Sequence, residues 1–541
     1  MFVTVGLESA ETTVGFTIHN PVSANWQIAK YADRRGVMRS VPVLPKWPGA
    51  IQPFGCTGDR TWANSAIMKI SAKILGGIDR PGNRELVDGE KLWTRAVDWS
   101  GALKNAGAGQ NRFIGLALPP SAEFFSALLG IWQSGAGALI VDPALSAPER
   151  KNICRFVEPV AMVSSDSEQW PVPVIGAPGS TADHDPAAMK FSGAEPALAL
   201  LTSGTTGQPK IVILSFAALD ARIRANIQAI GASTLNKTLQ TLSLSFGHGL
   251  IGSALTTLMA GGTLVLPQPG PGLPMKLGSL LDQHAISFMT SVPAFWHVVF
   301  KASPPPSGGC LKRVHVGSAP LSKTHWRKIA GWAGCPVFNC YGMTETANWV
   351  AAAPFTDQAA DGLVGHCLEG EFAIMGEDGS TAASGTGEVA LRSTGLMTGY
   401  YNQPEATVAV LKDGWYRTGD VGRLEQDGCL TLVGRRKEEI NRAGTKVQPV
   451  EVDQLLETHP DVVEACTFAV PDAVSGEAVA AAVVLSPGRV LEVHELAKWC
   501  LERARKEIVP THWYVVDQLC RTDRGKPDRT GQRRMLLDNG T

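Results

Sequence analysis

The alternation of short apolar runs with amphipathic stretches after Leu86 constrains the fold most strongly. Residues 111–118 (NRFIGLAL) and 137–143 (GALIVDP) have the composition of buried strands, and residues 121–135 (SAEFFSALLGIWQSG) between them predict an apolar-faced helix. The same rhythm recurs from about residue 190 to residue 345. Strands that alternate with helices predict an α/β fold built on parallel sheets.

The pattern changes between about residues 355 and 433, where helical periodicity fades. Residues 371–380 (EFAIMGEDGS), 387–393 (GEVALRS) and 428–435 (GCLTLVGR) are typical of strands joined by tight turns. This stretch predicts a small β subdomain. After Gly434 the mixed α/β pattern returns.

These changes predict a large N-terminal domain followed by a small C-terminal domain. Residues 61–434 are expected to hold two α/β subdomains and the β subdomain, and residues 435–541 a small α+β domain. Residues 86–94 (LVDGEKLWT) predict a hairpin-like start to the orderly region. Residues 1–60 show no clear period, and we treat them as an N-terminal extension without an assigned role.

Composition narrows the classes of partner. The net charge is -1, so the chain has no electrostatic footprint for nucleic acid or an anionic membrane, and a small-molecule substrate or a protein partner is favoured. The 10 cysteines form no CxxC pair, which indicates neither a zinc site nor a disulfide framework. A reducing, cytoplasmic location fits this cysteine usage best.

We expect neither a leader nor a membrane span. Its start (MFVTVGLESAETTVGF) lacks the basic flank and long apolar core of a signal peptide, and its acidic residues argue against a transit peptide. The longest uncharged apolar stretch runs from Gly249 to Leu266, but Gly261 and Gly262 interrupt it and Pro267 follows it. We expect a buried helix followed by a short strand there.

Residues 201–210 (LTSGTTGQPK) form a loop of glycines and hydroxyls between two apolar runs that read as strands. Glycines let the backbone approach a ligand closely, hydroxyls add donors and Lys210 adds a positive charge, which together suit a phosphate chain. The loop is not a Walker A motif, because only two residues separate Gly204 from Gly207 and Ile211 follows the lysine. A flexible surface turn is the alternative.

Four further motifs follow in order. They are YGMTE (341–345), GWYRTGD (414–420), GRRKEEINRAGTKVQPVEVD (434–453) and RTDRGKPDR (521–529). With the loop at 201–210, this ordered set resembles the adenylate-forming superfamily, which includes acyl-CoA synthetases, firefly luciferase and the adenylation domains of nonribosomal peptide synthetases. The resemblance spans about residues 85 to 530.

The resemblance implies a reaction in two steps. A carboxylate attacks the α-phosphate of MgATP to give an acyl-adenylate and pyrophosphate, and a thiol such as that of CoA then displaces AMP. A carboxylate is a poor electrophile, and an AMP leaving group corrects this. Charge builds up on phosphate oxygens, so such an enzyme needs fixed donors, a cation and Mg²⁺ more than it needs a nucleophile.

The resemblance also assigns roles residue by residue. Thr344 would contact the α-phosphate, Glu345 would ligate Mg²⁺, and Asp420 would accept both ribose hydroxyls with Arg435 close by. Tyr341 would stack on adenine. The phosphate loop would comprise Thr202, Ser203, Gly204, Thr205, Thr206, Gly207 and Lys210, and the other adenine face Gly317, Ser318, Ala319 and Pro320. Taken singly, these side chains are also typical of core aromatics, turn acids and surface cations.

The resemblance assigns roles to three residues of the C-terminal domain. In enzymes of this family that domain rotates between the two half-reactions. Lys526 matches the lysine that bridges the carboxylate and the α-phosphate. Lys437 falls at the hinge position. Gly444 lies in the loop that forms the thiol tunnel after rotation.

The acid-binding side is less defined. His248 resembles the histidine that precedes the acyl pocket, although a hydrogen-bonded core histidine is the alternative. Residues 242–252 contain no acidic side chain to pair a substrate ammonium, which disfavours an amino acid. Gly247, Gly249 and Gly252 suggest room for a bulky acyl or aryl group.

The leading functional hypothesis is an AMP-forming acyl-CoA synthetase that uses ATP, Mg²⁺ and CoA on a fatty, aryl or other bulky acid. The alternatives are an acyl-AMP ligase that loads a stand-alone carrier protein and a non-catalytic adenylate-binding homologue. The chain ends soon after Arg529, so no fused carrier domain is expected. Glu345, Asp420 and Lys526 are all present, which disfavours the non-catalytic alternative.

Overall fold

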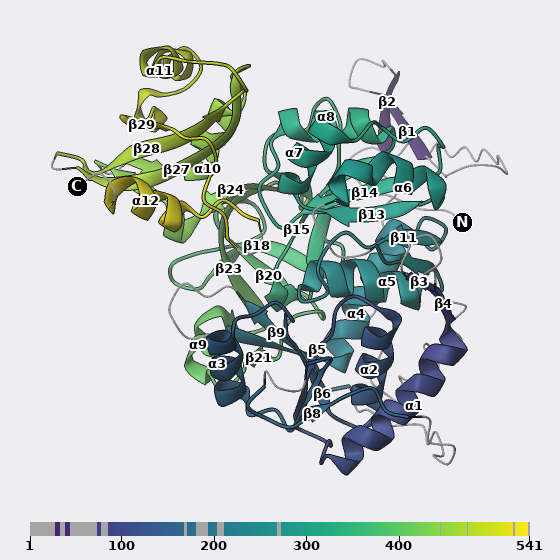
Figure 1. The fold of residues 1–541 in the computed structure, drawn as a ribbon. Coiled ribbons are helices and arrows are strands. Elements are labelled where there is room, and N and C mark those ends of the chain that lie inside the picture. The colour runs from purple at the N-terminus through teal and green to yellow at the C-terminus, as the bar shows by residue number, and fades with distance from the viewer. Residues whose placement is uncertain are drawn as a thin grey trace. The chain divides into compact units, whose positions relative to one another are not determined.

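The computed structural model describes residues 27–32, 38–43, 73–76, 85–166, 170–179, 193–202, 210–267, 272–443, 445–472, 474–522 and 525–538. The chain clusters into two units, Met1–Asp59 and Arg60–Thr541. In the first unit, β1 (Gln27–Ala32) pairs antiparallel with β2 (Met38–Val43). All other elements belong to the second unit (Figure 1).

The first sheet of the larger unit is mostly parallel. Its strands are β5 (Phe113–Ala117), β6 (Gly137–Ile140), β7 (Met162–Ser164), β8 (Val174–Ile175), β9 (Pro196–Thr202), β10 (Lys210–Ser215) and β21 (Gly399–Tyr400), in the order β21–β10–β9–β6–β5–β7–β8. The helices between them are α1 (Gly89–Asn105), α2 (Ala122–Gln133), α3 (Ala147–Val157) and α4 (Phe216–Ile230). The strands β9, β6, β5, β7 and β8 pair in parallel, which confirms the prediction from alternation.

The second sheet repeats this organisation. Its strands are β3 (Lys73–Gly76), β4 (Glu85–Asp88), β11 (Lys237–Leu239), β12 (Thr263–Val265), β13 (Phe288–Ser291), β14 (Arg313–Gly317), β15 (Val337–Gly342) and β16 (Trp349–Pro354), in the order β16–β15–β14–β13–β11–β12–β3–β4. Its helical segments are η2 (His248–Leu255, a π-helix), α5 (Thr256–Met259), η3 (Pro274–Lys276), α6 (Leu277–Gln283), α7 (Pro293–Ala302) and α8 (Lys323–Ala333). Ligands bind at the carboxyl ends of parallel strands, so a binding site is expected at the ends of β14 and β15.

The packing of α2 against α1 shows how the sequence builds these layers. Ser121 caps α2 by accepting a hydrogen bond from the amide of Phe124, at 3.2 Å. A Cβ at Gly130 would lie 2.3 Å from the Cβ of Trp99 in α1, so the helices approach each other at a position that only glycine fills. The close approach buries Trp99 almost completely.

The hairpin-like start predicted at residues 86–94 is wrong. The chain forms the strand β4 and passes directly into α1, with Asp88 as the N-cap. Its carboxylate accepts the amide hydrogen of Lys91 at 3.0 Å. The pair Asp88-Gly89 is a turn signal, but an Asp followed by Glu and apolar residues is also a helix start, and here the helix signal prevails.

The apolar stretch from Gly249 to Leu266 forms a buried helix and a short strand, as predicted. The segments η2 and α5 run through it, and β12 follows after the turn at Gly261. The residues of η2 are all buried. In the part of the chain that the structure describes, no helix is long and apolar enough to cross a membrane.

The third sheet is the predicted β subdomain. Its strands are β17 (Leu363–Gly365), β18 (Glu371–Met375), β19 (Thr381–Ala382), β20 (Gly385–Arg392), β22 (Leu411–Lys412), β23 (Trp415–Leu424) and β24 (Leu430–Arg435), accompanied by α9 (Pro404–Val410). All its pairings are antiparallel, in the order β17–β24–β23–β20–β18–β19 with β22 on β23. Just before it, the short helix η4 (Thr344–Thr346) follows β15.

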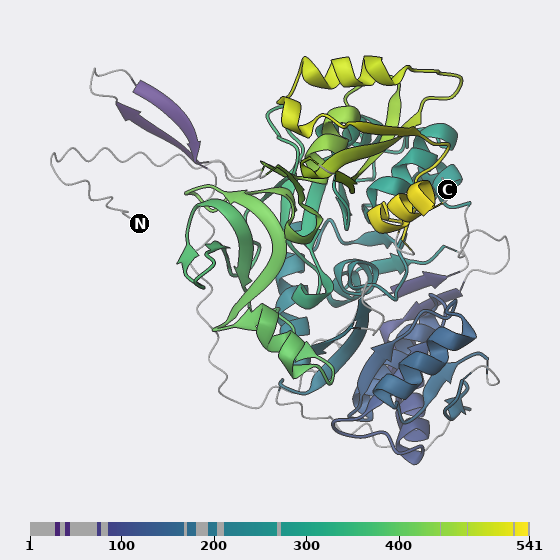
Figure 2. The ribbon, with the colours of Figure 1, turned by 90° about the vertical axis from the view of Figure 1, so that its left-hand side faces the viewer.

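The fourth sheet belongs to the C-terminal residues, which form the predicted α+β arrangement. The elements are η5 (Arg436–Glu438), β25 (Ile440–Arg442), β26 (Thr445–Val447), α10 (Pro449–Leu456), β27 (Val462–Asp472), β28 (Gly476–Leu485), α11 (Val493–Leu501), η6 (Lys506–Ile508), β29 (His512–Val515) and α12 (Arg529–Asp538). Alternate residues of β28 face opposite sides. Val479 and Val483 pack with α10 and α11, whereas Ala480 packs with α12, so helices cover both faces (Figure 2).

Candidate active site

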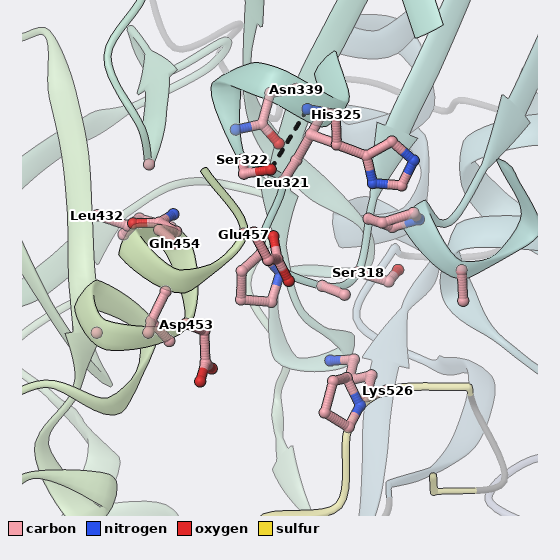
Figure 3. A pocket seen from close by; sticks show the side chains of 18 of the residues that line it. Ser318, Leu321, Ser322, His325, Asn339, Leu432, Asp453, Gln454, Glu457 and Lys526 are labelled. Carbon is pink, nitrogen blue, oxygen red and sulfur yellow. Dashed lines mark hydrogen bonds between the residues drawn. The ribbon is translucent and has the colours of Figure 1, made fainter. Parts of the chain in front are cut away.

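A cavity of about 270 Å³ lies where the ends of β14 and β15 meet the segment that follows β24 and the last turns of the chain. The predicted site residues among its lining are Ser318, Ala319, Pro320, Tyr341, Asp420, Arg435 and Lys526. Figure 3 shows Ser318, Glu457 and Lys526 around this cavity, each carried by a different part of the chain. Motifs that lie far apart in the sequence therefore line one cavity.

Asp420 forms the polar centre of one wall. It lies directly opposite Arg435 in the pairing of β23 with β24, and its Oδ1 is 2.8 Å from Nε of Arg435. Its Oδ2 accepts the hydroxyl hydrogen of Tyr341 at 2.6 Å. The Asp420 side chain is only 5% exposed whereas that of Arg435 is 48% exposed. The guanidinium thus compensates a buried carboxylate and extends into the open part of the cavity.

Burial and charge shift the pKa values of this group. Burial, followed by the charge of Asp420, holds the pKa of the Tyr341 phenol well above its usual range. The same carboxylate raises the pKa of Arg435. Tyr341 therefore remains a neutral hydrogen-bond donor and Arg435 a full positive charge.

Ser318 and His248 join the β14 end to η2. The hydroxyl of Ser318 lies 2.9 Å from Nδ1 of His248. Ser318 has a φ of 68°, in the left-handed region that favours glycine. A serine in this backbone conformation is strained. Nε2 of His248 is buried and has no hydrogen-bond partner among the described residues. Burial, then the charge of Lys526, lowers the pKa of His248 to about 4, so the ring is neutral at physiological pH.

Lys526 is presented by a tight turn. The amide of Thr522 donates to the carbonyl of Lys526 at 2.9 Å. The backbones of Arg521 and Pro527 pair as an isolated antiparallel β-bridge. Gly525 within this turn has a φ of 72°. These contacts hold Lys526 at the cavity.

Glu345 and Lys210 come together around Tyr400. The Tyr400 hydroxyl donates to Oε1 of Glu345 at 2.8 Å, and Nζ of Lys210 lies 4.9 Å from the centroid of the Tyr400 ring. Burial, with the charge of Glu345, raises the pKa of Tyr400. The sequence offered no signal for Tyr400, because an aromatic residue after Gly399 reads as an ordinary core residue. The bond orients a carboxylate oxygen, the ligand type that Mg²⁺ prefers, so the residues present fit that ion.

The η4 turn, which carries Thr344 and Glu345, rests on a buried arginine that sequence reasoning also missed. Arg222 of α4 is fully buried, donates through Nε to the Thr346 carbonyl at 3.3 Å and through Nη2 to Ser393 at 2.9 Å. Glu369 lies 3.8 Å from the same guanidinium. The network ties the turn to the β subdomain.

Other predicted residues lie elsewhere. Thr202 and Lys210 pair across β9 and β10, and the Thr202 hydroxyl donates to the Lys210 carbonyl at 3.1 Å. Lys437 is exposed on η5. His248, Gly317, Thr344 and Glu345 are not among the residues that line the cavity. The predicted residues that lie outside the described part of the chain are Ser203, Gly204, Thr205, Thr206, Gly207 and Gly444.

The idea that the glycines near His248 leave room for a large acid is wrong for all three. A Cβ at Gly247 would lie 2.8 Å from the Ala347 carbonyl oxygen. A Cβ at Gly249 would lie 2.1 Å from the Ser243 carbonyl oxygen. One at Gly252 would lie 2.2 Å from Nδ2 of Asn348. These glycines allow close packing of η2 against its neighbours and do not open onto empty space.

The cavity lining also includes three titratable residues that no motif indicated, His297, Glu457 and Glu464. His297 on α7 pairs with Glu464 on β27 at 3.0 Å, and Arg521 binds the same carboxylate. Glu457, at the end of α10, is half-buried, and its pKa is raised to about 8 by burial and by the charge of Asp453. The contact between His297 and Glu464 holds α7 against the C-terminal residues.

Two α/β regions, a β subdomain and a smaller α+β region are the architecture of adenylate-forming enzymes, and the second α/β region, the β subdomain and the α+β region line the cavity. A family model described as "AMP-binding enzyme" matches residues 82–401, more than half of the chain, and a second, "AMP-binding enzyme C-terminal domain", matches residues 451–526. The chain belongs to the family of AMP-binding enzymes.

Individual relatives agree with this assignment. A probable CoA ligase, CCL9, of Humulus lupulus is 34% identical over 61% of this chain and 64% of its own length. An oxalate–CoA ligase of Arabidopsis thaliana is 33% identical over 62% of this chain and 66% of its own length. The chain thus spans slightly less than two thirds of the length of either relative. ATP-bound MatB from Rhodopseudomonas palustris has the same fold, with a TM-score of 0.77 at 24% identity over 87% of this chain and 95% of that one.

Proposed function

We propose that the protein is an ATP-dependent ligase that joins a carboxylic acid to the thiol of CoA by way of an acyl-adenylate. The observation that carries the proposal is the convergence of Tyr341, Asp420, Arg435 and Lys526 on one cavity. Both relatives described above are named as CoA ligases, which supports the choice of CoA as the acceptor.

In this proposal the cavity binds the nucleoside half of ATP. The Asp420 carboxylate accepts the ribose hydroxyls, because a buried anion held by two partners is a fixed acceptor. Tyr341 and the segment Ser318–Pro320 line the space for adenine, and Arg435 faces the sugar and phosphate. Strand pairing already places Arg435 opposite Asp420, and a hydrogen bond already holds Tyr341 to the same carboxylate. Little reorganisation is therefore needed when the nucleoside binds.

The phosphate groups are proposed to meet positive charge from two sides. Lys526 approaches from the C-terminal turn, and Lys210 from the strand next to the loop at 203–209. Glu345, oriented by Tyr400, would hold Mg²⁺, which supplies charge neutralisation on the phosphate oxygens. Thr344, its neighbour on η4, is proposed to donate to the α-phosphate.

On the acid side, His248 is the polar group that we assign to the substrate. Its Nδ1 is engaged by Ser318, which leaves Nε2 for the acid. The absence of an acidic side chain at residues 242–252 disfavours a substrate with an α-ammonium group. We therefore propose a carboxylic acid that is not an amino acid.

The second half-reaction is proposed to require rotation of residues 435–541. Lys437, on η5 between β24 and β25, is the proposed hinge. Gly444 is the proposed tunnel residue. The rotation would withdraw Lys526 from the cavity once the adenylate has formed.

A panel of carboxylic acids tests the proposal directly. Pyrophosphate release is measured with fatty, aromatic, short dicarboxylic and proteinogenic amino acids, with and without CoA, and products are identified by mass spectrometry. The expected product is an acyl-CoA. Acyl-adenylate that accumulates while CoA is ignored and a carrier protein is acylated would favour the carrier-loading alternative. Release with amino acids alone would contradict the choice of substrate.

A further inference from the structure

Three side chains with different metal-binding groups meet on the β subdomain, away from the residues assigned to the reaction. They are His366, Asp427 and Cys429, and one ligand atom from each lies within 4.8 Å of the others. Nε2 of His366 is 3.7 Å from Oδ2 of Asp427. Two ligands bound to one tetrahedral zinc ion lie about 3.3 to 3.6 Å apart, given bonds of about 2.0 to 2.3 Å. The His366 and Asp427 atoms are therefore already near the spacing that a metal ion imposes, and the Cys429 sulfur lies within 4.8 Å of both.

Backbone pairing explains why the three meet. β17 pairs with β24, with Gly365 opposite Leu430, so His366 follows at the position next to Cys429. Asp427 and Cys429 belong to the tight turn between β23 and β24, which is closed by a hydrogen bond from the Gly428 amide to the Glu425 carbonyl at 2.9 Å. The position of a Cβ on Gly428 would be 3.9 Å from Cδ2 of His366, so the imidazole lies over this turn.

One of the ligands is also oriented in advance. The Cys429 amide donates to Oδ1 of Asp427 at 2.9 Å. This bond fixes the carboxylate so that its other oxygen, Oδ2, is the one near His366. Carboxylates and imidazoles in metal sites are commonly held in this way by hydrogen bonds to atoms outside the ligand set.

We propose that His366, Asp427 and Cys429 form a binding site for a divalent transition-metal ion, with zinc as the best fit. Imidazole nitrogen, thiolate sulfur and carboxylate oxygen are all zinc ligands, and magnesium and calcium select against sulfur. His366 and Asp427 are exposed and Cys429 is half-buried, so water takes the fourth position. On binding, the sulfur–metal bond forms as the thiol loses its proton to solvent, and the ion displaces hydration waters.

The site would act as a clamp between the end of β17 and the β23–β24 turn. β23 carries Asp420 and β24 ends at Arg435, so the metal would stabilise the pair of strands that holds both residues. Metal binding and its effect on stability do not depend on the proposed ligase activity.

Cobalt(II) spectroscopy of the full chain tests the proposal. Tetrahedral cobalt with a thiolate ligand gives intense visible bands and a sulfur-to-metal charge-transfer band, and zinc should displace it. Cys429→Ser should remove the charge-transfer band, and His366→Gln should weaken binding at least about tenfold in a zinc titration. Zinc should also raise the melting temperature of the unmodified chain and have no such effect on His366→Gln.

Cys335→Ser is the matched control, since Cys335 is also half-buried but lies outside the cluster. Its spectrum and zinc affinity should equal those of the unmodified protein. His366 is exposed, so its replacement tests the site even if Cys429→Ser fails to fold. Absence of tetrahedral cobalt bands, or bands that survive both the Cys429→Ser and His366→Gln changes, would overturn the proposal.

Discussion

The Ser318 hydroxyl lies 2.9 Å from Nδ1 of His248, on a residue whose φ of 68° is in the left-handed region. Glycine would occupy this backbone conformation without strain. What serine adds over glycine at this position is the hydroxyl that bonds to His248. The hydrogen bond fixes the orientation of the imidazole and leaves Nε2 directed elsewhere. The strain and the bond can be separated by two substitutions.

We expect Ser318→Ala to lose the hydrogen bond and keep the strain, and Ser318→Gly to lose both. The glycine variant should therefore be more stable than the alanine variant by about 1 kcal/mol, as measured by urea denaturation. Both should show a similar loss of acid-dependent pyrophosphate release, because both leave His248 unrestrained. Equal stability of the two variants would argue that the backbone is not strained.

Lys526→Ala should slow adenylate formation by about a thousandfold, because it removes a cation from the developing charge. Thioester formation from supplied acyl-adenylate should be far less affected. Gly444→Trp should give the opposite pattern. Pyrophosphate release and acyl-CoA formation from synthetic acyl-adenylate measure the two steps, with Lys498→Ala on exposed α11 as the control. Full adenylation activity in Lys526→Ala would mean that another lysine has this role.

Tyr400→Phe should reduce pyrophosphate release about tenfold and raise the Mg²⁺ concentration needed for half-maximal rate. The reason is the lost bond to Glu345, which then samples other orientations. Tyr401→Phe is a matched control, because the neighbouring hydroxyl donates instead to the Val157 carbonyl. An unchanged Mg²⁺ dependence in Tyr400→Phe would show that this tyrosine has only a packing role.

Asp420→Asn should raise the KM for ATP about 30-fold or more, since charge-assisted hydrogen bonds contribute about 1.5 to 3 kcal/mol each. The substitution also leaves the Arg435 guanidinium without its carboxylate. Asp378→Asn, in an exposed turn of the same sheet, should leave the KM unchanged. A change in kcat alone, with ATP binding intact, would contradict the assignment of Asp420 to the ribose.

Glu457 should make stability fall as pH rises. Its folded pKa is about 8, against 4.5 for an unperturbed carboxyl, because of burial and of the charge of Asp453. Between these two values the folded state holds a proton that the unfolded state has lost, so stability decreases by at most about 1.4 kcal/mol per pH unit. Glu457→Gln should gain stability over the unmodified protein at pH 8 and little at pH 5. Urea denaturation at both pH values checks this, with exposed Glu405→Gln as the control.

The sequence predicted the local elements well and their meeting points poorly. The strands that flank the loop at 203–209 and the three strands of the β subdomain follow from composition and turn residues alone. The register that sets Asp420 opposite Arg435 depends on strand pairing, which no local pattern encodes.

The contacts that sequence reasoning missed are non-local. Tyr400 reaches Glu345 across 55 positions, and Arg222 reaches Thr346 across 124. Cysteine spacing could not indicate the cluster proposed as a metal site, because His366 and Cys429 become neighbours only through β17 and β24. The sequence around each of these residues gives no sign of its partner, because the contact exists only in the folded chain.

The close packing at Gly252 has a consequence for protein engineering. A side chain there would displace Nδ2 of Asn348 or Nε1 of Trp349, which would lie 2.2 Å and 2.6 Å from its Cβ. A library that aims to alter acid preference should therefore keep the glycine fixed and vary the two facing side chains. Smaller residues at 348 or 349 would create volume beside Gly252 without moving the π-helix that carries it.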